Sequence, residues 1–384
     1  MVSLEHAVAG PFCTRQLADY GARVIKVERP GSGDFARDYD QTVRGMSSHF
    51  VWLNRGKESV TLDLKQPDAR AALQRLLARA DVLVQNLAPG ASSRLGLDFK
   101  ALAPKFPRLI LADLSGYGDE GPYRDKKAYD LLIQAEAGLI SITGGAAEPS
   151  RCGISIADIA AGMYAYSGIL IALFQRERTG SGTRIEVSML EALAEWMGYA
   201  LYFGGYGGKP PPRNGATHPA IAPYGPHRAG DGQDVIFGIQ NEREWAVFCR
   251  EVIARPELIG DDRFATNSRR VEHRFDLTDL IEQAFADASA DQVVQRLDRA
   301  GIANGRLNDI DSVLAHPQLK ARSRWRTVAT ETGPIEALLP PANLEGASAV
   351  MGDVPRLGQH TEAVLKELGY GLVEIESMRA RGAI

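Results

Sequence analysis

The first half of the chain alternates between short apolar runs and longer segments with helical spacing. Arg23–Glu28 and Ser59–Leu64 alternate apolar and polar residues, which is typical of strands with one buried face. Val82–Gln85 and Leu109–Leu114 are short apolar runs bounded by turns, typical of strands buried in a parallel sheet. Between these runs, Ala69–Arg79 places its leucines on one helical face. The alternation predicts βαβ units and an α/β fold with a doubly wound sheet.

A long apolar helix is expected from Asp158 to Arg178. Arg176 and Arg178 in its last turn and Gly180 just beyond it are common signals of a helix end. Asp158 is the one charge in the stretch GISIADIAAGMYAYSGIL, which is otherwise almost entirely apolar or small. A carboxylate at the start of such a helix is either a cap or a functional group, and position alone favours the cap.

The composition changes after a helix predicted for Leu190–Phe203. Gly204–Gly232 is rich in Gly, Pro and His, and is expected to be a long loop or an interdomain crossing. Val235–Gln240 is expected to be a strand, and amphipathic helices follow to about Arg299. With 384 residues the chain is too long for one ordinary core. The second half therefore predicts a second, smaller domain.

Bulk composition excludes several kinds of partner. A net charge of −4 gives no indication of nucleic acid or of an anionic membrane surface. The three cysteines are widely spaced without a CxxC pair, which fits a reducing cytoplasm. We find no run of apolar residues as long as a membrane span and no secretory signal pattern, so no membrane is expected.

The motifs of common cofactor sites are absent. The loop Glu5–Pro11 lacks the GxGxxG spacing, although Glu28 ends the second strand where a dinucleotide-binding protein places its ribose-binding acid, so NAD is not expected. The seven histidines are scattered without HExxH or a Cys/His cluster, so no metal is expected. What remains is a set of cations and carboxylates near strand ends. A parallel sheet gathers such groups at one edge, which suits a phosphate-bearing ligand, although each taken alone is a solvated surface charge.

Several stretches resemble the family III CoA-transferases, also called the CaiB/BaiF family. They occur in the family's order: AGPF…LADYGARVIKVERPGSGDFAR, LNRGKESVTLDLK, ADVLVQNLAPGASSRLGLD, LSGYGDEGPYRDKKAYD, GISIADIAAGMYA, RERTGSGTRIEVSMLEA and VPRLGQHTEAVLKELGY. The resemblance implies a Rossmann-like large domain, a smaller α+β domain and an interlocked homodimer. It places the large domain at residues 1–203, a Gly/Pro-rich linker at 204–223, the small domain at 224–315 and a segment that returns to the large domain at 316–384.

The resemblance implies that Asp158, by its place in ISIADIAAG, is the nucleophile of a CoA-transferase. Such an enzyme passes CoA from an acyl-CoA to a carboxylic acid through anhydride and aspartyl-CoA thioester intermediates. We expect the helix N-terminus to favour the ionised form of Asp158. We also expect Ala160, Ala161 and Gly162 to leave room for the thioester. The cap and the nucleophile are then one residue.

The resemblance also implies which residues contact CoA, by their positions within the matching stretches. The implied residues are His6, Val8, Ala9, Arg37, Asn54, Lys57, Asn86, Leu87, Arg94 and Lys127. Gly204–Gly208, with Gly204 and Gly205 at its start, resembles a mobile glycine loop that covers the reacting aspartate. Arg213, His218 and His227 are expected to hold the carboxylate of the acceptor, which favours a small dicarboxylate.

Two alternative functions are open. The α-methylacyl-CoA racemases share this fold and need an acid/base pair, with a histidine directly before an acidic residue, where this chain has Tyr129 and Asp130. Tyrosine titrates near 10 and is a poor base, so transfer is favoured, and Tyr129 is expected to donate a hydrogen bond near the reacting carbonyl. Asp130 either orients the substrate or caps the helix Leu131–Ala137. The other alternative is a non-catalytic acyl-CoA-binding protein, against which the presence of both Asp158 and the basic residues argues.

Overall fold

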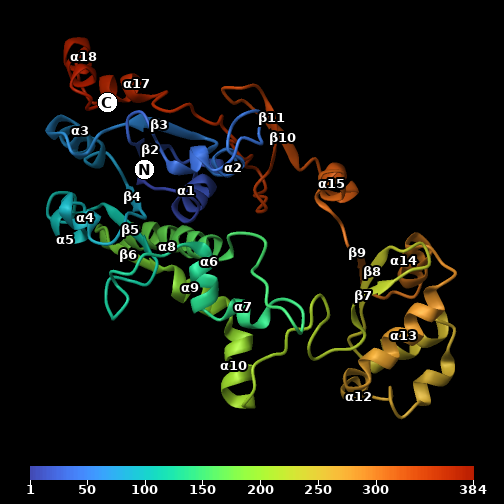
Figure 1. The fold of residues 1–384 in the computed structure, drawn as a ribbon. Coiled ribbons are helices and arrows are strands. Elements are labelled where there is room, and N and C mark those ends of the chain that lie inside the picture. The colour runs from blue at the N-terminus through green and yellow to red at the C-terminus, as the bar shows by residue number, and fades with distance from the viewer. The chain divides into compact units, whose positions relative to one another are not determined.

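Six strands form a parallel sheet in the order β3-β2-β1-β4-β5-β6 (Figure 1). The strands are β1 (Val2–Leu4), β2 (Val24–Glu28), β3 (Lys57–Thr61), β4 (Val82–Gln85), β5 (Ile110–Ser115) and β6 (Arg184–Ser188). This is the order of dinucleotide-binding folds, in which the direction of winding reverses between β1 and β4. The prediction of an α/β fold with a doubly wound parallel sheet is therefore confirmed.

The computed structural model describes residues 1–384, which divide into two units. The first unit contains the parallel sheet and comprises Met1–Leu139, Cys152–Tyr199 and Gln318–Ile384. The second comprises Ile140–Arg151 and Ala200–Pro317. Both ends of the chain therefore belong to the first unit.

Helices cover both faces of the parallel sheet. Val82 and Val84 on β4 pack into the core on one face, and Leu83 packs into the core on the other. The first face is covered by α1 (Ala9–Asp19), α6 (Asp130–Glu136), α8 (Ile156–Thr179) and α9 (Met189–Trp196), and the second by α3 (Pro67–Leu77), α5 (Phe99–Leu102), α17 (Thr361–Glu367) and α18 (Leu372–Ala380). Because both faces are buried, the strands read as apolar runs in the sequence.

The C-terminal segment covers the outer edge of the sheet at β3. The backbone N–H of His360 donates to the carbonyl oxygen of Ser59, and the N–H of Thr61 donates to Oγ1 of Thr361. Figure 1 shows α17 and α18, in red, beside α3 although they lie at the far end of the sequence. An edge strand whose backbone groups are paired in this way is protected from joining another sheet.

Helix α8 lies against α1 through a glycine. A Cβ atom added at Gly162 would lie 2.7 Å from the carbonyl oxygen of Ala9, which is closer than real Cβ atoms approach backbone. Ala160 and Ala161 are fully buried in the core. The small residues after Asp158 therefore bring α8 onto α1, and this corrects the expectation that they leave room for a thioester.

The length and composition of α8 also correct the expectation about apolar runs. Its 24 residues, with a mean hydropathy of 1.6 in the most apolar window, are long and apolar enough to cross a membrane. The core helix of a globular protein meets the same criterion, and 39% of this window is buried in the structure. One such helix is weak evidence for a membrane span.

The helix predicted for Leu190–Phe203 is two helices, α9 and α10 (Gly198–Gly207). Four residues of the predicted glycine loop, Gly204–Gly207, are thus helical. The glycine content of this run predicts a loop because glycine is a poor helix former, but the structure continues the helix through it. Tyr202 and Tyr206, one turn apart, stack with ring centroids 6.1 Å apart.

The first unit also contains short helices and a hairpin. They are η1 (Phe35–Asp38), α2 (Ser48–Asn54), α4 (Ala91–Arg94) and the antiparallel pair β10 (Trp325–Val328) and β11 (Ile335–Leu338). The helices α7 (Leu139–Ile142) and α16 (Pro317–Ala321) fall at the divisions between the two units.

The second unit has a three-stranded antiparallel sheet with its own core. Its elements are β7 (Tyr224–Arg228), β8 (Asp234–Gly238), β9 (Asn304–Arg306), α11 (Glu242–Val247), η2 (Phe248–Val252), η3 (Pro256–Gly260), α12 (Asn267–Glu272), α13 (Arg274–Phe285), α14 (Ala290–Arg299) and α15 (Ile310–Leu314). Phe237, Trp245, Phe248 and Phe285 are buried together at its centre. β7 lies in the segment predicted to be a loop.

Candidate active site

A network of buried charges joins the carboxyl end of β1 to β2 and to Lys57 at the start of β3. Glu5 directly follows β1, and its carboxylate accepts a hydrogen bond from Lys57 Nζ at 2.7 Å and from Thr14 Oγ1 at 2.7 Å. Lys26 Nζ on β2 lies 3.6 Å from the same carboxylate. The side chains of Glu5, Lys26 and Lys57 are entirely buried. The two lysines lower the pKa of Glu5 against the opposing effect of burial, so the carboxylate is charged.

The network continues into the segment that follows β2. Lys26 Nζ donates to Asp34 Oδ2 at 2.7 Å. Glu28 accepts from the backbone N–H of Asp34 at 3.0 Å and from both Nε and Nη2 of Arg37, at 2.9 and 2.8 Å. Three carboxylates and three cations thus balance one another, which a buried network requires.

This network and β4 together fix the loop that follows β1. The side chain of Asn86 accepts from the backbone N–H of His6 at 2.8 Å and donates to its carbonyl oxygen at 2.9 Å. Asp34 Oδ1 accepts from the N–H of Ala7 at 3.1 Å. Ala7 has a φ of +59°, a conformation that costs energy for any residue other than glycine. Polar contacts on both sides therefore hold a strained loop at the point where the winding of the sheet reverses.

Asp158 lies at the start of α8, next to this loop. It is half-buried, and its carboxylate accepts a hydrogen bond from the backbone N–H of Ala9. No cation contributes to its ionisation. Burial, and then the charge of Asp130, raise the pKa of Asp158 to about 7. The expectation that the helix N-terminus favours an ionised Asp158 is therefore corrected, because these two effects are larger.

Asp130 caps α8, which is not its own helix. Its Oδ1 accepts from the backbone N–H groups of Ala157 at 2.8 Å and of Asp158 at 3.3 Å. Asp130 is itself the first residue of α6, whose N-cap is Tyr129. Of the two roles left open for Asp130, capping is therefore seen in the structure, but on a different helix from the predicted one.

Tyr39 lies near Asp158, and Tyr129 lies near Tyr39. Tyr129, a predicted site residue, is exposed, so its hydroxyl is accessible to a ligand. Tyr39, which follows η1, was missed by the sequence analysis. Burial and the nearby carboxylates of Asp34 and Asp158 raise the pKa of Tyr39 to about 12, so the phenol stays protonated as a hydrogen-bond donor. No sequence signal marks Tyr39, because its proximity to Asp158 arises only from the fold.

An aromatic row extends from the first loop past Tyr39. His6 stacks on Phe35 with centroids 5.4 Å apart, Phe35 contacts Tyr39 at 5.8 Å, and Tyr39 contacts His49 at 5.4 Å. Phe35 and Tyr39 are about half exposed. Of this row, Tyr39 lies near the carboxylate of Asp158.

Some of the residues predicted to contact CoA are buried with partners inside the protein, and others are exposed at the edge of the sheet. Lys57 and Asn54 are buried, and Lys57 Nζ donates to Asn54 Oδ1 at 3.1 Å, so these two residues support the first loop from the interior. Arg37 is occupied by Glu28 and lies 3.7 Å from the centre of the Phe50 ring. A buried cation with its donors already used has none left for a phosphate, which corrects the carried-over role of Lys57.

Other predicted contacts lie at the open edge of the sheet. Arg94 and Lys127 are exposed, Asn86 and Leu87 are half-buried after β4, and Val8 and Ala9 are buried at the start of α1. The sequence analysis missed Arg29 and Lys65, which are exposed just after β2 and β3. Their positions after strand ends were visible in the sequence, so the same edge argument that selected Arg94 would have found them.

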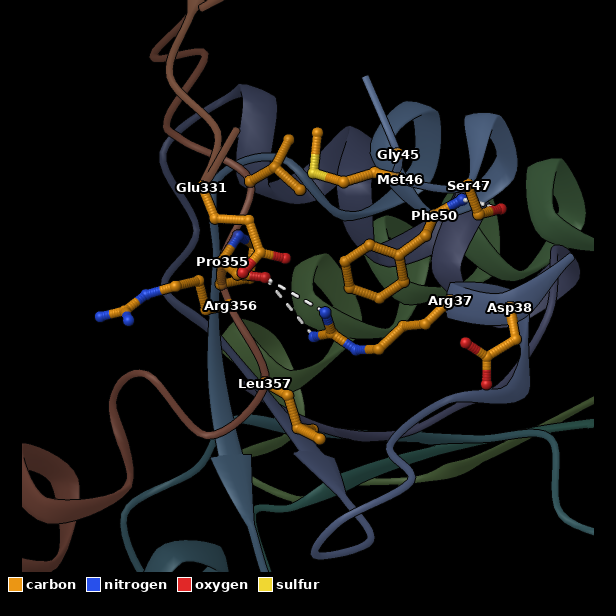
Figure 2. A pocket seen from close by; sticks show the side chains of 11 residues that line it. Arg37, Asp38, Gly45, Met46, Ser47, Phe50, Glu331, Pro355, Arg356 and Leu357 are labelled. Atoms are coloured by element: carbon orange, nitrogen blue, oxygen red, sulfur yellow. Dashed lines mark hydrogen bonds between the residues drawn. The ribbon is translucent and has the colours of Figure 1, made fainter. Parts of the chain in front are cut away.

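A cavity of about 430 Å³ lies beside Arg37, away from Asp158 (Figure 2). Its lining includes Phe50, Glu331 and Arg356, and Figure 2 shows the Arg37 guanidinium donating to the carbonyl oxygen of Pro355. Neither Asp158 nor Asp130 lines it. This cavity is therefore separate from the candidate nucleophile.

The residues predicted to hold the acceptor carboxylate have other partners within the second unit. Arg213 donates to the backbone carbonyls of Gly145, Ser141 and Ala146, at 3.1 to 3.2 Å. The predicted role of this arginine is corrected, because each arm of its guanidinium already has a carbonyl partner.

The two histidines of the same prediction also have structural roles. His218 Nδ1 accepts from the N–H of Ala220 at 3.2 Å, and its ring stacks on Tyr224. His227 is buried in β7 and stacks on Phe237 with centroids 4.8 Å apart. Burial lowers the pKa of His227 to about 4, so it is a neutral core residue. The role of His227 in acceptor binding is therefore corrected, whereas that of His218 stays a prediction.

Asp158 lies beside the point where the winding of the sheet reverses, which is where open α/β sheets bind ligands, and comparison with known proteins identifies the family. The chain belongs to CoA-transferase family III, whose model matches residues 1–361. It is 38% identical to the acetyl-CoA:oxalate CoA-transferase of Acetobacter aceti, over 84% of this chain and 83% of that protein. It is 33% identical to the succinyl-CoA:glutarate CoA-transferase of Mus musculus, over 100% of this chain and 89% of that protein.

A solved structure agrees with these matches. The structure of a CaiB/BaiF family protein from Brucella suis has a TM-score of 0.85 to this chain at 33% identity, covering 96% of this chain and 97% of the other. The predicted family and the predicted class of enzyme, a CoA-transferase, are confirmed. Its substrates are accordingly CoA thioesters and carboxylic acids. The structure shows no group of three or more His, Cys, Asp or Glu residues placed to hold a metal ion.

The buried position of Lys57 predicts a loss of stability when its charge is removed. Lys57→Met leaves the Glu5 carboxylate short of a cation, and we expect the free energy of unfolding to fall by about 3 kcal/mol in a urea titration. Arg94→Met, at an exposed cation, is the control and should change the unfolding free energy by less than about 0.5 kcal/mol while raising the KM for acyl-CoA. If Lys57→Met leaves the unfolding free energy unchanged and only raises the KM for acyl-CoA, Lys57 binds a phosphate of CoA after all and this prediction is wrong.

Proposed function

We propose that this enzyme transfers CoA from an acyl-CoA to a small dicarboxylic acid through covalent intermediates on Asp158. The observation that carries the proposal is the environment of Asp158. It is a half-buried carboxylate without a cation partner, beside the loop at which the winding of the sheet reverses. Ligands of open α/β sheets bind at this point. A carboxylate whose charge is poorly compensated is reactive toward an activated carbonyl.

The reaction follows four acyl transfers that balance in atoms and charge. Asp158 attacks the thioester carbonyl and the C–S bond breaks. The CoA thiolate is released, and Asp158 and the acyl group are joined as a mixed anhydride. The thiolate attacks the aspartyl carbonyl of the anhydride, which releases the first acid and forms the aspartyl-CoA thioester. The acceptor carboxylate attacks this thioester and gives a second anhydride and the thiolate. The thiolate then takes the acceptor's acyl group and frees Asp158.

The surroundings of Asp158 suit these steps. The phenol of Tyr39, which lies near Asp158, and that of Tyr129, which lies near Tyr39, would donate to the oxygen that gains charge in each tetrahedral intermediate. The exposed cations after the strand ends, Arg29, Lys65 and Arg94, are placed for the phosphates of CoA. The aromatic row from His6 to Tyr39 would bound the acyl group.

The proposal predicts covalent labelling of Asp158 and a defined pH dependence. Incubation with succinyl-CoA and hydroxylamine should convert Asp158 into a hydroxamate, detected by peptide mass spectrometry. Asp158→Asn, which can still accept from Ala9, should lower kcat by at least about three orders of magnitude while keeping CoA binding. Because the attacking form is ionised and its pKa is about 7, kcat/KM should rise with pH through 7. CoA binding without any labelling of Asp158 would refute the mechanism.

The choice of acceptor rests on the relatives. Among them are CoA-transferases named for oxalate, for glutarate and for D-citramalate, which are all dicarboxylates. With succinyl-CoA as donor, we expect kcat/KM for oxalate, glutarate or malate to exceed that for propionate and butyrate by at least about tenfold, equivalent to about 1.4 kcal/mol. A preference for the monocarboxylates would contradict the dicarboxylate proposal and leave the transferase mechanism intact.

We also propose that two copies of the chain form the interlocked homodimer implied by the family resemblance. The support is an exposed apolar face on α8, where Leu170, Ile171 and Phe174 share one side of the helix at 43%, 67% and 63% exposure. Such a patch is larger than isolated surface residues produce and is typical of an interface.

The homodimer predicts a change of mass on mutation. Ile171→Glu combined with Phe174→Glu should convert a dimer into monomers in sedimentation equilibrium, since burying two unpaired charges is costly. Glu177→Lys, a charge change at an exposed polar position of the same helix, should leave the mass unchanged. A monomeric wild-type protein would contradict the proposal.

A further inference from the structure

Gln134 is a fully buried polar residue on α6, one helical turn after Asp130. Both ends of its side-chain amide are used. Nε2 donates to Asp130 Oδ2 at 2.6 Å and to the carbonyl oxygen of Ile154 at 3.4 Å, and Oε1 accepts from the backbone N–H of Cys152 at 2.9 Å. The amide has only this orientation, because a flip would place Oε1 against a carboxylate and Nε2 against an N–H donor.

These contacts join Gln134 to the start of α8 by two routes. Cys152 and Ile154 lie in the segment that leads into the helix, and the amide holds both. The second route passes through Asp130, whose other oxygen accepts from the N–H groups of Ala157 and Asp158. Gln134 therefore fixes the first turn of α8 without touching the carboxylate of Asp158.

The route through Asp130 has a chemical consequence for Asp158. The free N–H groups of a helix N-terminus stabilise a nearby negative charge. Here Asp130 takes the N–H groups of Ala157 and Asp158, so they are not available to the Asp158 carboxylate. Asp130 also brings a like charge close to it. A carboxylate that is less stabilised by donors, and opposed by a like charge, shares its electrons more readily with a carbonyl carbon.

We propose that Gln134 is a positioning residue for CoA transfer: by holding the Asp130 carboxylate on the first-turn N–H groups of α8, it sets both the place of Asp158 and its strength as a nucleophile. The proposal rests on the proposed function of Asp158. The ionisable groups that face Asp158 are Asp130 on α6 and Tyr39 after η1, with Tyr129 beside Tyr39.

The test is the variant Gln134→Met, which keeps the length of the side chain and removes its donor. Without the donor, nothing holds the Asp130 carboxylate on the first-turn N–H groups of α8, and it can turn away, which moves its charge from beside Asp158 and frees those N–H groups. In a plot of kcat/KM against pH, we expect the rise on the acid side (the acid limb) to move to lower pH by at least about half a pH unit. We expect the kcat/KM of the plateau at high pH to fall by about tenfold. A residue with a purely structural role would lower the plateau and leave the acid limb in place.

Gln85 offers a matched control. It is a buried glutamine on β4 whose Nε2 donates to Asp113 Oδ1 at 2.6 Å, the same kind of contact at the same distance. Gln85→Met should cost a similar amount of stability in a urea titration and leave the acid limb unchanged. If both variants leave the acid limb where it is in the wild type, Gln134 has no more influence on Asp158 than an equivalent buried amide, and the proposal is overturned.

A second readout needs no substrate. The side-chain carbonyl resonance of ¹³C-labelled Asp158, assigned by its loss in Asp158→Asn, reports the ionisation of Asp158 during an NMR titration. We expect its midpoint to fall in Gln134→Met and in Asp130→Asn, and the double variant to match Asp130→Asn alone because both changes act through one link. Additive shifts, or an unchanged midpoint, would overturn the proposal.

This titration also separates the two hypotheses. Absence of labelling at Asp158 with acyl-CoA would refute the proposed function, and the NMR midpoint would still decide whether Gln134 controls Asp158. Should Gln134→Met fail to fold, Asp130→Asn tests the same link. It keeps an acceptor for the N–H groups of α8, and a midpoint that does not fall in this variant refutes the proposal.

Discussion

The site depends on the buried ion network that joins the carboxyl end of β1 to β2 and to the start of β3. Glu5 and Lys57 meet at 2.7 Å, and Lys26 and Asp34 meet at the same distance, all with no exposed side-chain surface. Removing charges from water is expensive, and a buried network persists only when each charge has a partner in good geometry. Because its members come from β2, from β3 and from the segments that follow β1 and β2, the network holds the first loop in a single position. That position includes the strained backbone of Ala7 and the N–H of Ala9 that meets Asp158.

The close approach of α8 to α1 then brings Asp158 to this loop. Gly162 permits the approach, and a side chain there would meet the carbonyl oxygen of Ala9. Asp130 closes the start of α8 from a third element, and Gln134 supports Asp130 from the core. The carboxylate of Asp158 is thus held by packing and by one backbone donor, without a cation. This arrangement positions a charge while leaving it reactive, in contrast to the neighbouring network, where each charge is neutralised.

Several residues selected from the sequence serve the site indirectly. Lys57 and Asn54 are hydrogen-bonded to each other in the interior, under the first loop. The Asn86 side chain bonds to both the N–H and the carbonyl oxygen of His6. Residue type and order along the chain indicated that these side chains belong to the site. They did not indicate which of them face the ligand, because a lysine at a strand start reads the same whether it is buried on a carboxylate or exposed to solvent. Tyr39 and Gln134 illustrate the opposite case, since neither belongs to a motif and each gains its importance from a neighbour distant in sequence.

The sequence by itself determined the alternation of strands and helices, the parallel sheet and the family, because apolar periodicity and ordered motifs are local properties of the chain. It also singled out Asp158 as a lone charge in an apolar segment. Only the tertiary structure decided how that charge behaves. The helix N-terminus suggested an ionised carboxylate, whereas burial and Asp130 raise its pKa. The ionisation of Asp158 depends on its burial and on Asp130, 28 positions away in the chain. Burial and electrostatic interactions depend on distances in space, which the local pattern of residues does not contain.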